Sequence, residues 1–411
     1  MRKNIIVNTL WGNLNLAVRY GSSFVATFLL ASVYTPEQFG LYQLVLTTIT
    51  MVGVFNFFHP AHLSNHLIKN PEDESRICGL WALQSLVIWI GVTIFLAVAY
   101  LRDRQDEFLY LMLLSSGRLF FKVTECVGMA ASVRLRNDLA QLSEMFGVGV
   151  FNLVRVILAL LKAPVTILTL ATPSQGLFLS AYHLIIRRKL GIVFSTSGLS
   201  LGFAKDIFRS GMLMTIVGFL AGFQARIFSV LLSFRMPPAD YGNFQLVIKL
   251  IEPLTAVAVI IFGVNYTVLA HTLNRDVRTF YKRFLKVGVV CLGVAALFCI
   301  TVVVVPPDFF VAIFGSKYRD AAELVWMGSW MVLTGTFLMV VQQYDTLRSR
   351  YGRLIVVNLA IVLLYGIAVL YYTDGISIRE AMVLSAVIPF VVAVLALCGV
   401  LIDMKRDRNE T

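Results

Sequence analysis

The chain has 411 residues, of which 58% are hydrophobic and only 14% are charged, and its mean hydropathy is +0.80. A soluble domain carries about 25% charged residues, so this composition excludes a soluble enzyme or binding module. The formal net charge of +12 would suggest nucleic-acid binding in a soluble protein. In a membrane protein, however, the placement of Lys and Arg along the chain matters more than their sum.

Apolar runs long enough to cross a hydrocarbon layer of about 30 Å recur along the whole chain. Twelve such runs predict an all-α, polytopic membrane protein. The predicted spans are residues 12–33, 41–59, 78–100, 108–131, 141–161, 164–186, 210–233, 243–266, 286–305, 322–342, 354–372 and 381–402. The first ten residues lack the apolar core and cleavage site of a signal peptide, so we expect no segment to be removed.

The sequence gives little indication of a metal site, a disulfide or a cofactor. All five cysteines lie within or at the ends of apolar spans, without the spacing of a disulfide framework or a zinc site. His59, His62 and His66 have a spacing compatible with metal ligands, but no cysteine is near and the segment contains proline. Walker-type phosphate loops are absent from the sequence. We therefore predict no catalytic residue, no metal and no cofactor.

The distribution of positive charge predicts the orientation. If the N-terminus is cytoplasmic, 22 of the 35 Lys and Arg residues fall on the cytoplasmic side, seven on the outer side and six within spans. This positive-inside bias predicts that both termini are cytoplasmic. Contact of the basic loops with anionic lipid headgroups then accounts for the high charge, and no nucleic-acid partner is expected.

The chain contains an internal repeat. Residues 36–45 (PEQFGLYQLV) and 238–247 (PADYGNFQLV) are identical at five of ten positions and lie 202 residues apart. Each copy follows the first span of its half, which favours duplication over chance. The repeat predicts two six-helix bundles, residues 1–198 and 199–411. Because six is an even number of spans, the bundles share one orientation and a pseudo-two-fold axis along the membrane normal, as in transporters.

Six cations lie within predicted spans. They are Arg19, Arg118, Lys122, Arg155, Arg226 and Lys249. A cation at the centre of a bilayer costs about 2.5–3.5 kcal/mol, so all six must face protein, water or a ligand rather than lipid. Only Glu125 and Glu252 oppose them within the spans, which predicts a net positive interior.

The four arginines have no carboxylate at helical spacing in their own spans, and a guanidinium offers paired donors to the paired oxygens of a diphosphate. We therefore predict that the embedded cations bind an anionic substrate, with snorkelling to the cytoplasmic face as the alternative for Arg19. Lys122 with Glu125, and Lys249 with Glu252, are spaced i, i+3, so each pair is alternatively an internal ion pair. The two glutamates are also candidates for coupling an ion to transport.

Two local patterns indicate how the site is built. Arg118, Lys122 and Glu125 are spaced i, i+4 and i+7, which places them on one helical face that must point inward. Pro253 directly follows Glu252, so it removes a helical hydrogen bond beside a charged pair and is a candidate hinge.

Residues 36–45, residues 210–247 and the segment 314–318 with Ala321 and Ala322 resemble the Wzx-type polysaccharide (O-antigen) flippases of the multidrug, oligosaccharidyl-lipid and polysaccharide exporter superfamily. The resemblance implies a monomeric, non-enzymatic carrier in a bacterial inner membrane. It implies movement of an undecaprenyl-diphosphate-linked oligosaccharide from the cytoplasmic to the periplasmic leaflet, for O-antigen, capsule or exopolysaccharide. Its implied partners are this substrate, membrane lipids and other polysaccharide-assembly proteins.

Three alternatives remain. A multidrug and toxin efflux antiporter of the same superfamily would share the twelve spans and two bundles. Binding of organic cations, however, favours carboxylates over a positive cavity. A peptidoglycan-precursor flippase typically carries two more spans. A membrane-embedded glycan polymerase or ligase needs larger outer loops than the spans leave room for. For any of the transporters we predict alternating access, in which the two halves rock about the substrate.

Overall fold

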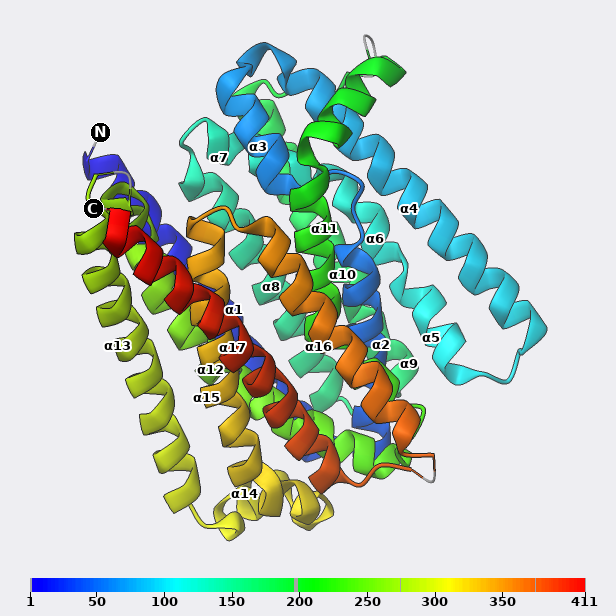
Figure 1. Ribbon diagram of the computed structural model, residues 1–411. Helices are drawn as coiled ribbons and strands as arrows, with labels where there is room; N and C mark the ends of the chain where they lie inside the picture. Colours follow the sequence, from blue (N-terminus) through cyan, green and yellow to red (C-terminus); the bar gives the residue numbers. More distant parts are fainter. Residues whose placement is uncertain (1, 196–198, 274, 374, 411) are drawn as a thin grey trace. The chain divides into compact units, whose positions relative to one another are not determined.

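The computed structural model describes residues 2–195, 199–273, 275–373 and 375–410, and within these ranges its regular structure is entirely helical (Figure 1). The helices are α1 (Arg2–Val33), α2 (Pro36–Val54), α3 (Pro60–Lys69), α4 (Glu74–Arg102), α5 (Glu107–Ser115), α6 (Gly117–Phe121), α7 (Glu125–Val133), α8 (Asn137–Leu160), α9 (Val165–Thr169), α10 (Ala171–Leu190), α11 (Leu201–Leu232), α12 (Pro238–Leu273), α13 (Val277–Val304), α14 (Pro307–Phe314), α15 (Arg319–Leu347), α16 (Tyr351–Tyr371) and α17 (Ile378–Glu410). Short 3₁₀ turns η1 (Pro71–Asp73), η2 (Lys122–Thr124) and η3 (Ser316–Tyr318) join some of them.

The all-α membrane fold predicted from the sequence is confirmed. Among the described residues, nine helices are long and apolar enough to cross a bilayer. The other three predicted spans correspond to α2, to the run α5–α7 and to the pair α9–α10. Backbone amides and carbonyls have no water to bind inside a bilayer, so a chain this apolar forms helices that satisfy those groups internally.

The span predicted over residues 108–131 is helical but is not one regular α-helix. The segment is broken into α5, α6, η2 and α7. Near the second break, Trp81 Nε1 donates a hydrogen bond to the Lys122 carbonyl at 2.9 Å, and Ser180 Oγ donates to the Phe121 carbonyl at 3.1 Å. Side chains that bind these carbonyls compete with the helical i to i−4 hydrogen bonds, which is a recognised cause of helix breaks.

The chain divides into two compact units. Unit 1 comprises Met1–Val33 and Leu41–Gly222, and unit 2 comprises Tyr34–Gly40 and Phe223–Thr411. The short segment Tyr34–Gly40 of the first half therefore clusters with the second half, and α11 begins in unit 1 and ends in unit 2. The bundle boundary predicted between residues 198 and 199 concerns the internal repeat and stays a prediction.

Unit 1 is organised around α8. Helix α1 packs along it, and α10 packs on both α8 and α6. Asn15 of α1 donates hydrogen bonds to Gln141 at 2.6 Å and to Glu144 at 2.8 Å, while Asn152 of α8 donates to Ser22 of α1 at 2.7 Å. Amide side chains in an apolar bundle must bind one another, so these contacts fix the register of α1 on α8.

Unit 2 is organised around α15, which packs against α12, α13 and α17. In α15, 56% of the most apolar stretch is buried inside the protein, the largest share among the nine spanning helices of the described residues. The other helices of the unit lie around it and keep apolar faces available to lipid, as expected where the solvent is hydrocarbon.

A cluster of ion pairs joins α15, α16 and α17 at one end of unit 2. Arg353 of α16 donates to Asp345 of α15, with Nε to Oδ1 at 2.6 Å, and to Asp403 of α17 at 3.0 Å. Arg348 pairs with Asp407 of α17 at 2.8 Å. The sequence alone indicated only that these arginines are cytoplasmic cations. Their aspartate partners lie on other helices, so only the packing of those helices brings the charges together.

We expect Arg353→Met to destabilise unit 2. The Asp345 side chain is 0% exposed, so the substitution leaves a buried carboxylate without its guanidinium partner, a loss of about 3–5 kcal/mol. Arg319→Met is the matched control, because that side chain is 69% exposed and its pair with Glu323 contributes less than about 1 kcal/mol. Thermal unfolding in detergent measures both, and equal melting temperatures for the two variants would contradict the assignment.

Candidate functional site

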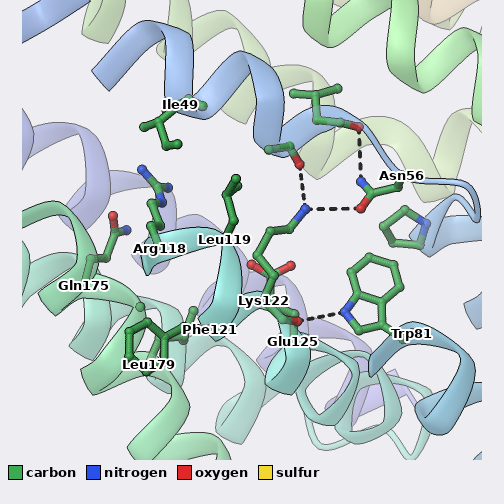
Figure 2. A pocket seen from close by; sticks show the side chains of 15 residues that line it. Ile49, Asn56, Trp81, Arg118, Leu119, Phe121, Lys122, Glu125, Gln175 and Leu179 are labelled. Carbon is green, nitrogen blue, oxygen red and sulfur yellow. Dashed lines mark hydrogen bonds between the residues drawn. The ribbon is translucent and has the colours of Figure 1, made fainter. Parts of the chain in front are cut away.

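Unit 1 contains two adjoining cavities of about 300 and 450 Å³. Both are lined by Trp81 of α4, Arg118 of α6, Glu125 of α7 and Gln175 of α10. Figure 2 shows Arg118 beside Gln175 on one side of the smaller cavity, and Lys122 turned toward Asn56 and Trp81 on the other. The 3₁₀ turn η2 lies between Arg118 and Glu125, so the point at which this span departs from α-helical hydrogen bonding borders a cavity.

The charge of the cavities is mixed. Arg19, Arg118 and Lys122 contribute three cations, and Glu125 and Glu144 contribute two carboxylates. Glu125 lies near enough to Lys122, Arg118 and Glu144 to interact electrostatically with all three. The three residues predicted to share one inward face, Arg118, Lys122 and Glu125, do line one cavity. In these two cavities the cations outnumber the carboxylates by one, and the net positive interior predicted for all the spans together stays a prediction.

Lys122 is held by the protein itself. Its Nζ donates to the Gly53 carbonyl at 2.6 Å and to Asn56 Oδ1 at 3.1 Å, and it lies 5.9 Å from the centre of the Trp81 ring (Figure 2). It forms no salt bridge with Glu125, although both residues lie in the described part of the chain. Gly53 is near the last turn of α2, where helical carbonyls lack intrahelical partners, so Lys122 caps that helix end.

Arg155 lies outside both cavities. Its side chain is buried, donates from Nη1 to Asn152 at 3.1 Å, and has the rings of Tyr42 and Phe151 centred 5.4 and 5.0 Å from the guanidinium carbon. Two aromatic faces partly compensate a desolvated cation. This geometry supports a packing role inside unit 1 more than direct contact with a substrate.

The remaining predicted site residues belong to unit 2. Arg226 is partly buried on α11. On α12, Lys249 Nζ donates to Glu252 Oε2 at 2.7 Å, so the ion pair suggested by their spacing is present. The helix continues through Pro253, and the hinge at this proline stays a prediction.

Sequence reasoning missed several residues that shape the site. Gln175, Trp81 and His183 line the cavities but carry no formal charge, so a search for embedded charges passed over them. His183 is buried and makes contacts at 3.1 Å with both Thr124 and Ser143. Uncharged polar residues inside apolar spans were the available signal, because such groups must find partners in a bundle.

The three histidines of the 59–66 string have separate partners. His59 accepts a hydrogen bond from the Ala61 amide at 3.2 Å and caps α3. His62 Nε2 lies 3.0 Å from Ser210 Oγ, and His66 Nε2 lies 2.9 Å from Asp73 Oδ2. Burial, followed by the neighbouring His66, lowers the pKa of His62. These contacts give each ring a structural role at the end of unit 1.

Comparison with known proteins identifies the fold. No protein-family model and no curated protein matches the sequence. Solved structures do match over nearly the whole chain. One is the inward-facing conformation of a multidrug resistance MATE family transporter of the MOP superfamily, with 14% identity, a TM-score of 0.73 and 96% of each chain covered. Its outward-facing conformation matches with 14% identity, a TM-score of 0.62, and 98% and 96% coverage of this chain and that one.

A third match is a MOP superfamily transporter from Pyrococcus furiosus, described as having a binding pocket of reverse polarity that suggests a different function. It shares 13% identity, with a TM-score of 0.64, and covers 97% of this chain and 95% of that one. The chain therefore has the fold of the MATE-type, alternating-access transporters. These neighbours are transporters rather than enzymes. Identities this low establish the fold and leave the substrate open.

We expect Lys122→Met to lower stability, because it removes two hydrogen bonds from a charged donor, each contributing about 1.5–3 kcal/mol, and leaves the Gly53 carbonyl without that partner. Lys205→Met, at an exposed position on α11, is the control and should leave the melting temperature unchanged. A Lys122→Met protein as stable as the control would show that the hydrogen bonds from Lys122 to Gly53 and Asn56 do not contribute to stability.

Proposed function

We propose that the protein is an alternating-access transporter for an amphiphilic substrate bearing a negatively charged group, and that this substrate is an undecaprenyl-diphosphate-linked oligosaccharide flipped from the cytoplasmic to the periplasmic leaflet. The observation that carries the proposal is the guanidinium of Arg118 in a cavity of unit 1, beside Gln175 and within the same cavity system as Arg19. The fold of known transporters supports the transport part.

We assign the anion contact to Arg118 because it lines both cavities, whereas Arg155 lines neither and is enclosed by aromatic rings. Arg118 and Arg19 are the cations that line the larger cavity. A guanidinium binds diphosphate oxygens through paired donors, and the Gln175 amide adds a neutral donor next to it. In this proposal the polyprenyl tail stays in the lipid while the headgroup occupies the cavity.

Multidrug extrusion is the second candidate, and the comparisons favour it over the flippase. Two of the matched structures are of a multidrug resistance MATE family transporter. Glu125 and Glu144 line the cavities and supply the carboxylates that an organic cation would need. The same carboxylates are candidates to exchange a coupling ion during the cycle, as proposed for Glu125 from the sequence.

The cellular setting follows from the same proposal. We place the protein in a bacterial inner membrane with both termini in the cytoplasm, because positive charge is concentrated in the loops of that side. The carrier would act without catalysing a chemical step. Its partners would be the lipid-linked substrate, surrounding anionic lipids and other polysaccharide-assembly proteins.

Deletion of the gene in its native host separates the two candidates. A flippase predicts that lipid-linked oligosaccharide accumulates in the cytoplasmic leaflet and that surface polysaccharide is lost. A drug exporter predicts unchanged polysaccharide and increased sensitivity to cationic toxins. Unchanged polysaccharide in the deletion strain would contradict the flippase.

Arg118→Gln should reduce transport at least about tenfold, because it removes a charge-assisted contact of about 1.5–3 kcal/mol to the substrate anion. Arg118→Lys should recover part of the rate, since it keeps the charge but loses the paired donors. Complementation of surface polysaccharide at matched expression provides the measurement. If Arg118→Gln complements as well as the exposed control Lys205→Gln, Arg118 does not bind the substrate.

A further inference from the structure

A third cavity in unit 1, of about 450 Å³, lies at the C-terminal end of α10. Gly191 follows the last helical residue with a φ of 64°, the left-handed conformation that commonly ends a helix. The residues on both sides of this turn line the cavity, and none of them lines the two cavities of the candidate site. They are Leu184, Arg187, Arg188, Gly191, Ile192 and Val193.

The guanidinium of Arg187 is held in place by the chain that follows the turn. Its Nε donates a hydrogen bond to the Ile192 carbonyl at 3.2 Å, and its central carbon lies 4.8 Å from the centre of the Phe194 ring. Its Nη groups form no hydrogen bond with another residue that the structure describes. An arginine fixed in this way loses less side-chain freedom when it binds a ligand.

The backbone carbonyls at this helix end already have donors. The Arg187 carbonyl accepts a hydrogen bond from the Ile192 amide at 3.1 Å, and the Leu190 carbonyl accepts one from Arg134 Nη1 at 2.6 Å. Arg134 in turn binds Glu74 through its Nε at 2.8 Å. The acceptors near the cavity are therefore occupied, and the cavity presents mainly hydrogen-bond donors.

Positive charge accumulates at the same place. Arg187, Arg188 and Lys189 occupy the last turn of α10. Within the described residues, none of the three forms a salt bridge with a carboxylate. Cations stabilise the C-terminal end of a helix through its dipole, which explains their position on α10 but not the cavity between them. The positive-inside rule places them on the cytoplasmic side, at the level of anionic headgroups.

Apolar side chains continue the same face of α10 away from the cations. Leu184 is spaced i, i+3 from Arg187 and i, i+4 from Arg188, so the three share one face of the helix. Leu184 is 46% exposed, and Val193 on the other side of the turn is 56% exposed. This order of apolar and then basic residues matches the order of acyl chain and phosphate in a phospholipid.

We propose that this cavity binds the phosphate of an anionic phospholipid of the cytoplasmic leaflet between Arg187 and Arg188, with an acyl chain along Leu184 and Val193. A guanidinium presents paired donors to phosphate oxygens. Ligand pockets commonly have volumes of about 300–1,000 Å³, so the cavity has room for the headgroup as well as its phosphate. This is one defined lipid site, beyond the general contact of basic loops with headgroups, and it does not depend on the proposed transport function.

Native mass spectrometry of the full-length protein in detergent tests the site. During titration with phosphatidylglycerol, one lipid should bind more tightly than all later copies. Phosphatidylcholine carries a phosphate but no net charge and should bind at least about tenfold more weakly. Equal binding of the two lipids would overturn the proposal. Glycerol phosphate at millimolar concentration should not displace the bound lipid, and displacement would identify a free phosphate as the ligand instead.

The double variant Arg187→Gln with Arg188→Gln should weaken binding of phosphatidylglycerol by about tenfold or more. Lys205→Gln with Arg209→Gln is the matched control, because it removes two exposed cations from α11 that do not line the cavity. The control should bind the lipid as the parent does. An equal loss of binding in both double variants would show general charge attraction and would overturn the site.

Two single variants apply if the double variant fails to fold. Arg188→Gln keeps the Arg187 hydrogen bond to Ile192 and should weaken phosphatidylglycerol binding by a smaller factor than the double variant. Val193→Glu introduces a carboxylate at an exposed lining position and should abolish the preference for phosphatidylglycerol over phosphatidylcholine. Binding equal to that of the parent in both folded variants would contradict the assignment of the lipid to this cavity.

Discussion

The cost of a charged side chain in hydrocarbon constrains every other feature of this structure, at about 2.5–3.5 kcal/mol for a central cation. The protein meets that cost in different ways. Lys249 pairs with Glu252, Lys122 binds the end of α2, and Arg155 lies between two aromatic rings. Arg19 and Arg118 line the larger cavity, and Lys122 also lines the smaller one. The candidate site therefore holds three cations, and its near-balanced charge comes from Glu125 and Glu144.

The broken fourth span connects the fold to this site. The carbonyls of Phe121 and Lys122 accept hydrogen bonds from Ser180 and Trp81, in addition to local ones from Thr124 and the Glu125 amide. The 3₁₀ turn η2 lies between Arg118 and Glu125, and both residues line the same cavity while Lys122 binds the end of α2. Close approach of α10 helps, because a Cβ on Gly176 would lie 2.7 Å from Phe121 Cβ. Packing of neighbouring helices, more than local propensity, thus decides the shape of the site.

The repeat and the comparisons support the same class of protein from separate directions. The repeat implies two like-oriented halves, and the matched structures are transporters solved in inward-facing and outward-facing conformations. Neither identifies the cargo, because a fold positions a cavity but its side chains choose the ligand. In this chain that choice depends on whether Arg118 or the glutamates dominate the cavity, which is a question of local geometry and protonation.

The sequence by itself determined the all-α membrane fold and most of the spanning helices, because hydropathy is a local property of a helix. Its i, i+3 spacing also offered the Lys249–Glu252 pair as an alternative to substrate binding, and that pair is present. It also located Arg118, Lys122 and Glu125 on one face, which the cavity preserves. Only the tertiary structure decided that Lys122 binds Gly53 and Asn56 and that Arg155 lies against the ring of Tyr42. Each of these contacts joins residues that are distant in the sequence. The packing of the helices brings such residues together, and no pattern along a single helix predicts it.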